Sequence, residues 1–118
     1  MKTVLFTPEV TDHIDFLIPL LYELGYFRDK EKSRKYFKNL IDDIKKYLPI
    51  RQHKPAPSCF HKFLNITEHT EYMEYTSFSR NRNTAWYVFF TVYEDEETGE
   101  DIYLVCYIAN NHTVAQHL

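Results

Sequence analysis

Glycine and cysteine are scarce in this chain, with two residues of each. Two glycines cannot build a Gly-rich phosphate-binding loop. The cysteines form no Cys-x-x-Cys metal motif and no disulfide framework, and six scattered histidines form no His-Glu-x-x-His motif. No apolar run approaches the roughly 20 residues that cross a bilayer, and the first apolar stretch is too short for a signal peptide. We therefore expect a cytoplasmic protein with reduced thiols, no metal, no cofactor and no membrane partner.

The rest of the composition is typical of one globular domain spanning residues 1–118. A chain of 118 residues that is 44% hydrophobic can bury a core without metals or disulfides. Its charge is segregated along the sequence. Residues 28–62 hold eleven basic and four acidic residues, a net charge of +7, whereas residues 63–118 hold two basic and nine acidic residues, a net charge of −7. The basic block could attract phosphate, or it could be a solvated helix face.

A strand followed by a helix is expected at the N-terminus. Residues 2–6 are largely apolar and β-branched, and Thr7 and Pro8 suit the cap and the first position of a helix. Apolar residues then recur at helical spacing until Gly25, which should end the helix. Pro19 has no N–H to donate, so we expect it to kink or split this helix.

A second helix is expected from about residue 30 to residue 48, because Asp29 can cap it and apolar side chains recur on one broad face. Since only about five residues link the two helices, they should form an antiparallel hairpin. The proline-rich residues 49–58 predict a loop, and residues 59–66 fit a short helix as well as a strand.

The second half of the sequence changes to the alternation of β-strands. Strands are expected over residues 71–79, 84–93 and 101–109, joined by a polar turn and then by an acidic turn, and followed by a short tail. We therefore predict an α+β fold. An N-terminal strand and an antiparallel helix hairpin would pack with a mainly antiparallel sheet that ends in a three-stranded meander, the helices on one face.

Alternation along the last two strands assigns their side chains to two faces. The purer hydrophobic set should pack on the helices, and it comprises Trp86, Val88, Phe90, Val92, Ile102, Leu104, Cys106 and Ile108. The tyrosine-rich set should line the opposite face, and its candidate binding residues are Tyr87, Phe89, Tyr103 and Tyr107. Tyrosine offers a large contact area with a polar tip, so this face could be an interface, or residues 49–66 could cover it.

One group of polar residues could form a catalytic or phosphate-binding site. Arg80 and Arg82 precede the central strand of the meander, and His112 follows its last strand. In an antiparallel hairpin the start of one strand lies beside the end of its neighbour, so these side chains should share one edge. Arginine binds phosphate and histidine can move a proton near neutral pH, so together they could bind or cleave RNA. The alternative is a polar sheet edge with solvated arginines.

The order of elements and three segments resemble the RelE/ParE toxin superfamily along the whole chain, apart from a long segment at residues 49–70. The segments are Phe6-Thr7-Pro8-Glu9, the arginine-then-aromatic run from Arg82 to Phe90, and the strand from Ile102 to Ile108 that leads into Asn110-Asn111-His112. The last two segments are most similar to the subgroup known as plasmid-stabilisation proteins.

The resemblance implies the toxin component of a type II toxin–antitoxin system, with a cognate antitoxin as its partner. RelE-like members cut mRNA on the ribosome without a metal. By that resemblance the chain would be a ribosome-dependent mRNA endonuclease with Arg80, Arg82 and His112 as catalytic residues. His117 is the fourth candidate, at a position near which the family often carries a terminal aromatic residue.

The alternative is a non-catalytic protein-binding module of the same fold, either a ParE-like inhibitor of DNA gyrase or a member that has lost its toxicity. Ribosome-targeting members are usually strongly basic. Residues 63–118 carry a net charge of −7 instead, and should repel RNA unless the basic helices dock it. On this interpretation the tyrosine-rich face binds a partner protein, and a homodimer is a further option.

Overall fold

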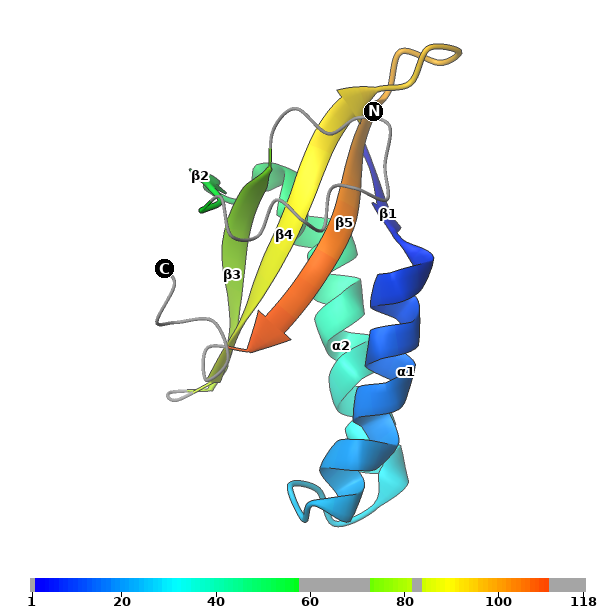
Figure 1. Cartoon of the computed structure of the whole chain (residues 1–118), viewed down its shortest axis with the longest axis vertical. Coiled ribbons are helices and arrows are strands. Elements are labelled where there is room, and N and C mark those ends of the chain that lie inside the picture. The colour runs from blue at the N-terminus through cyan, green and yellow to red at the C-terminus, as the bar shows by residue number, and fades with distance from the viewer. Residues whose placement is uncertain (1, 58–72, 82–83, 111–118) are drawn as a thin grey trace.

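Two helices cover one face of a five-stranded sheet in the computed structural model, which describes residues 2–57, 73–81 and 84–110 (Figure 1). The strands are β1 (Lys2–Phe6), β2 (Lys54–Pro55), β3 (Glu74–Asn81), β4 (Thr84–Glu94) and β5 (Asp101–Asn110). Their order across the sheet is β1-β5-β4-β3-β2, and only the β1–β5 pair is parallel. The predicted α+β fold, with its N-terminal strand, helix hairpin and C-terminal meander, is confirmed.

The first helix, α1 (Pro8–Glu23), begins and ends as its sequence predicts. The hydroxyl of Thr7 accepts a hydrogen bond from the backbone N–H of Val10 at 3.3 Å, and Pro8 takes the first helical position. Gly25 follows the helix with a φ of +83°, a conformation that favours glycine. Pro19 lies inside α1, which continues through it as one helix, so the expected split does not occur.

The second helix, α2 (Lys30–Tyr47), packs beside α1 on the same face of the sheet (Figure 1). Asp29 caps it by accepting a hydrogen bond from the N–H of Lys32 at 2.8 Å. The buried stripe of α2 contains Phe37, Leu40 and Ile44 at helical spacing. Its polar member is Ser33, fully buried, whose hydroxyl donates to the carbonyl of Ile18 at 2.7 Å and so joins the two helices. None of the described helices is long and apolar enough to cross a membrane.

The faces of β5 differ from the alternation that its sequence suggests. Phe89 of β4 pairs with Tyr107, but the next residue, Phe90, pairs with Val105, so β5 holds one extra residue at Cys106. Such a bulge moves every side chain beyond it to the other face.

Tyr103 and Val105 therefore pack in the helix-side core, while Leu104 and Cys106 lie on the opposite face. The predicted placements of Tyr103 on the tyrosine-rich face and of Leu104 and Cys106 on the helix side are wrong for this reason. Other placements are right, because the residues lie on the other side of the bulge or on the regular strand: those of Tyr107, Tyr87, Phe89, Trp86, Val88 and Phe90.

The face opposite the helices is partly covered within the described residues. Ala56 packs there against a cluster that includes Met73, Phe89 and Cys106, and its N–H donates to the carbonyl of Met73 at 2.9 Å. Phe89 has no exposed surface. Part of the 49–66 segment thus covers this face, as one of the two predicted alternatives requires.

Candidate functional site

The sequence analysis predicts that the candidate catalytic residues lie at one end of the sheet, where β4 begins and β5 ends. Trp86 pairs with Asn110, and Asn81 pairs with Thr84 across the β3–β4 turn. We call this end, with Arg80, Thr84, Trp86 and Asn110, the rim. The predicted juxtaposition of strand start and strand end is confirmed for these residues. Arg82, His112 and His117 lie outside the described residues.

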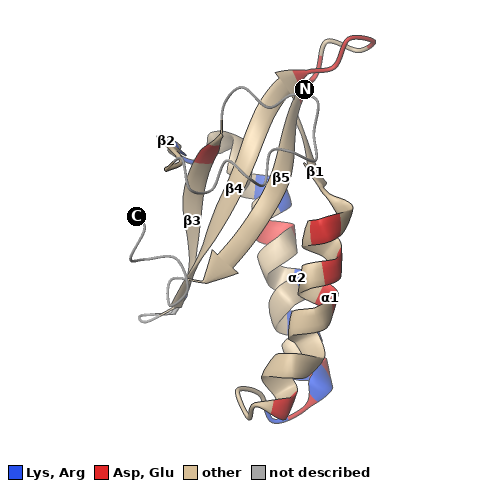
Figure 2. Cartoon of the chain, viewed as in Figure 1, with Lys and Arg blue, Asp and Glu red and all other residues tan. Residues whose placement is uncertain are grey.

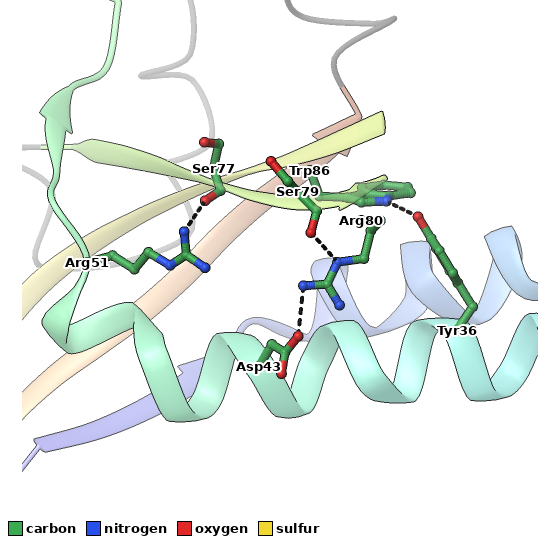
Figure 3. A network of polar contacts seen from close by, with 7 residues as sticks. All are labelled: Tyr36, Asp43, Arg51, Ser77, Ser79, Arg80 and Trp86. Carbon is green, nitrogen blue, oxygen red and sulfur yellow. Dashed lines mark hydrogen bonds and ion pairs between the residues drawn. The ribbon is translucent and has the colours of Figure 1, made fainter. Parts of the chain in front are cut away.

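Arg80 is already partnered at the rim. Its guanidinium lies 2.7 Å from a carboxylate oxygen of Asp43 on α2, and its Nε donates to the carbonyl of Ser79 at 3.1 Å (Figure 3). The Arg80 side chain is only 15% exposed, against 40% for Asp43. A phosphate that binds Arg80 must therefore compete with this carboxylate.

Tyr36 and Trp86 form the second polar contact of the rim. The indole Nε1 of Trp86 donates to the Tyr36 hydroxyl at 2.8 Å, which ties α2 to β4 (Figure 3). Burial raises the pKa of Tyr36, while the hydrogen bond from Trp86 and the charge of Arg80 act against the rise. Since tyrosine ordinarily titrates near pH 10, the hydroxyl carries its proton at neutral pH.

A pocket of about 280 Å³ opens beside these residues, and we call it the rim pocket. Four aromatic residues and three others line it: Tyr26, Phe27, Tyr36, Trp86, Leu21, Thr84 and Asn110. The turn after α1 positions Tyr26, because the N–H of Gly25 bonds to the carbonyl of Tyr22 and the N–H of Tyr26 bonds to the carbonyl of Leu21. The Phe27 and Tyr36 rings then meet at a centroid distance of 5.2 Å.

Most acidic residues described in the second half lie at the other end of the β4–β5 hairpin, with Glu74 on β3 as the exception (Figure 2). Six of the nine occupy its turn, namely Glu94, Asp95, Glu96, Glu97, Glu100 and Asp101. β4 is 11 residues long, so this turn is roughly 30 Å from the rim at the usual rise per residue. That distance is several Debye lengths at physiological salt, so these charges are largely screened from the rim.

The tyrosine-rich face carries a row of aromatic rings across three strands. Phe89 lies between Tyr75 and Tyr107, with both centroid distances at 5.7 Å, and Tyr87 lies 6.1 Å from Tyr75. We call these four residues the aromatic row. Phe89 is buried and the three tyrosines are half-buried, and burial raises the pKa of Tyr107.

A second cavity, of about 480 Å³, extends from the aromatic row to the strand edge of β3. It is lined by Arg51, Gln52, Lys54, Tyr75, Thr76, Ser77 and Tyr87. The Arg51 guanidinium lies over the Phe78 ring at 4.4 Å and donates to the carbonyl of Ser77 at 3.3 Å (Figure 3). Neither cation of this cavity has a carboxylate partner in the described ranges.

Three residues that contact the rim or line the rim pocket were not among those predicted from sequence. Tyr36 was assigned only to the apolar face of its helix, and Asp43 and Tyr26 were given no role. A signal existed for Tyr26, because an aromatic residue directly after a helix-ending glycine is held by the capping turn. The contact of Asp43 with Arg80 joins residues 37 positions apart, so no local sequence pattern predicts it.

The described residues hold no group of three or more His, Cys, Asp and Glu side chains that could bind a metal ion. No family model, curated protein or solved structure matches this chain. The resemblance to the RelE/ParE superfamily therefore stays a prediction.

Proposed function

We propose that this chain is the toxin component of a type II toxin–antitoxin pair with the RelE/ParE fold, and that it cleaves RNA at the rim without a metal. The order of strand, helix hairpin and antiparallel meander supports the fold assignment. The observation that supports RNA cleavage at the rim is the pairing of Trp86 with Asn110. It brings the described residues that flank Arg82 and precede His112 to one edge, beside Arg80.

This proposal gives roles to Arg80 of the rim and to three candidates outside the described residues. Arg82 binds the scissile phosphate and offsets the charge that develops on it, as guanidinium groups do in phosphate recognition. His112 transfers a proton as acid or base, with His117 as a further candidate. Arg80 joins the phosphate only when it exchanges Asp43 for it, because the two are ion-paired.

The distribution of charge supports RNA binding at the rim more than the net charge of the chain does. The acidic turn is at the far end of the hairpin from the rim (Figure 2), and Tyr36 of the rim pocket belongs to α2, a helix that carries more basic than acidic residues. Because electrostatic attraction to RNA is local at physiological salt, the negative charge of residues 63–118 does not by itself prevent binding.

The test is cleavage of ribosome-bound mRNA by the purified chain. We expect the wild-type protein to cut the message, and His112→Ala to slow cleavage by about 100-fold or more, the usual contribution of an acid or base. His13→Ala, at an exposed position on α1, is the matched control and should cut normally. Intact mRNA with the wild-type chain, or equal cleavage by His112→Ala, would end the catalytic proposal.

The second candidate is a non-catalytic module that binds a partner protein, such as its antitoxin or DNA gyrase, through the aromatic row. The cavity beside Tyr75 and Tyr87 favours it, because half-buried tyrosines with adjacent cations are typical of binding surfaces. Tyr87→Glu should then abolish partner binding while circular dichroism and melting temperature stay normal. Tyr47→Glu, on the exposed side of α2, should bind as the wild type does. Normal binding by Tyr87→Glu would exclude this face.

A further inference from the structure

We propose that the rim pocket holds one unstacked nucleobase of a single-stranded RNA. The inference rests on the proposed function, because it assigns a subsite to the same RNA, but it concerns base binding rather than cleavage. The residues that carry it are the four aromatic side chains of the pocket, none of which belongs to the predicted catalytic set.

The size and walls of the pocket suit one planar ring system. Pockets for drug-sized ligands start at about 300 Å³, so a volume of about 280 Å³ fits a smaller ligand. Its walls combine Tyr26, Phe27, Tyr36 and Trp86, and aromatic side chains are the usual platforms on which unstacked bases lie. Thr84 and Asn110 add a hydroxyl and an amide, the groups that read base edges.

The exposure of Tyr26 is the feature that a purely structural role does not explain. Its side chain is 73% exposed although it lines an aromatic pocket, whereas the neighbouring Trp86 is 3% exposed. The pocket wall thus has a buried side, fixed by the bond from Trp86 to Tyr36, and an open side formed by Tyr26. A base that enters would cover apolar surface of Tyr26 that now faces water.

Two cations close in sequence to the pocket lining suit the phosphates of a nucleotide, although neither lines the pocket itself and Asp29 and Glu31 lie beside them in sequence. Arg28 directly follows Phe27, and Lys32 lies one helical turn before Tyr36 on the same side of α2. Both are exposed, and neither forms an ion pair within residues 2–57, 73–81 and 84–110. They can therefore bind the phosphates on either side of the base.

The experiment uses Trp86 as its reporter, because it is the sole tryptophan of the chain. The full-length protein is titrated with a hexamer of adenylate and with a hexamer of abasic residues that carries the same phosphates. We expect the adenylate hexamer to quench Trp86 fluorescence and to bind at least several-fold more tightly than the abasic one. Equal affinity for the two, or binding without any change in fluorescence, would overturn the inference.

Variants of Tyr26 separate stacking from charge. Tyr26→Ala should weaken binding of the adenylate hexamer by about 5- to 100-fold, the usual effect of removing one stacking ring, and leave the abasic hexamer unchanged. Tyr26→Phe keeps the ring and should bind normally. Tyr47→Ala removes a tyrosine from the other end of α2 and is the matched control. If Tyr26→Ala binds the adenylate hexamer as the wild type does, the pocket does not hold a base.

The two proposals can fail separately. Binding of the hexamers needs no ribosome and no cleavage. If the chain prefers the adenylate hexamer but leaves mRNA intact, the proposal of base binding stands and the proposal of RNA cleavage fails. Cleavage of mRNA by a chain that does not distinguish the two hexamers would do the reverse.

Discussion

Replacing Asp43 by asparagine should turn Arg80 from a structural residue into an RNA-binding one. The 2.7 Å ion pair holds the guanidinium against α2, and a neutral amide would bind it far less strongly. The released side chain can then reach a phosphate at the rim. The substitution should therefore lower the stability of the fold slightly and strengthen binding to single-stranded RNA.

Asp43→Asn should have a small effect on stability and a measurable effect on the salt dependence of RNA binding. Exposed ion pairs contribute about 0.2–1 kcal/mol, and Asp43 is exposed enough for solvent to screen the pair. We expect the free energy of unfolding to fall by no more than about 1 kcal/mol, or about 4 °C in melting temperature. One added phosphate contact should steepen the plot of log affinity against log salt by about 0.7 for a single strand.

The assay is binding of a single-stranded RNA at several salt concentrations, with Asp42→Asn as the control. Asp42 is the exposed neighbour of Asp43 on α2, and its substitution changes the net charge by the same amount without touching the Arg80 pair. A steeper slope for Asp43→Asn alone is the expected result. The same slope for both variants would show that only net charge matters and that Arg80 does not reach the phosphate.

Four other predictions concern the core and its thiol. Ser33→Ala removes the buried hydrogen bond to Ile18 and should lower the free energy of unfolding in urea by about 1 kcal/mol, and no change would mean that the bond adds nothing to stability. Leu40→Ala creates a cavity at a fully buried position and should cost about 2–5 kcal/mol, so a smaller loss would show that the helix–sheet core collapses around the gap. Burial raises the pKa of the Cys106 thiol from 9.0 to about 11, so in a Cys59→Ser background iodoacetamide at pH 8 should label it only after unfolding, as mass spectrometry would show. By the same shift, its contribution to stability is complete below pH 9 and is lost as the pH rises toward 11, and a flat stability curve over that range would contradict it.

Local chemistry made the elements of this fold predictable. Thr7 and Asp29 cap their helices through bonds to residues three positions ahead, and Gly25 ends a helix because it adopts a positive φ. These interactions lie within a few residues of one another, so the sequence alone expresses them. Pro19 shows the limit of such rules, because α1 continues through it although proline removes one backbone hydrogen bond.

The candidate site was predictable only in outline. Hairpin geometry placed the start of β4 beside the end of β5, since antiparallel pairing leaves no other arrangement. The pairing of Arg80 with Asp43 and the enclosure of the rim pocket by the turn after α1 depend on how the helix hairpin docks on the sheet. Docking joins residues far apart in sequence, and no local pattern encodes it.

The sequence by itself determined where the two helices and the longer strands lie and that the last three strands form a meander, because capping, periodicity and turn chemistry act over a few residues. It did not show β2, which lies within residues 49–58, a segment predicted to be a loop. The tertiary structure alone decided that a bulge at Cys106 turns Tyr103 toward the helices. It also decided that a carboxylate of α2 holds Arg80. These features arise from strand register and helix docking, which are set by the packing of the whole core.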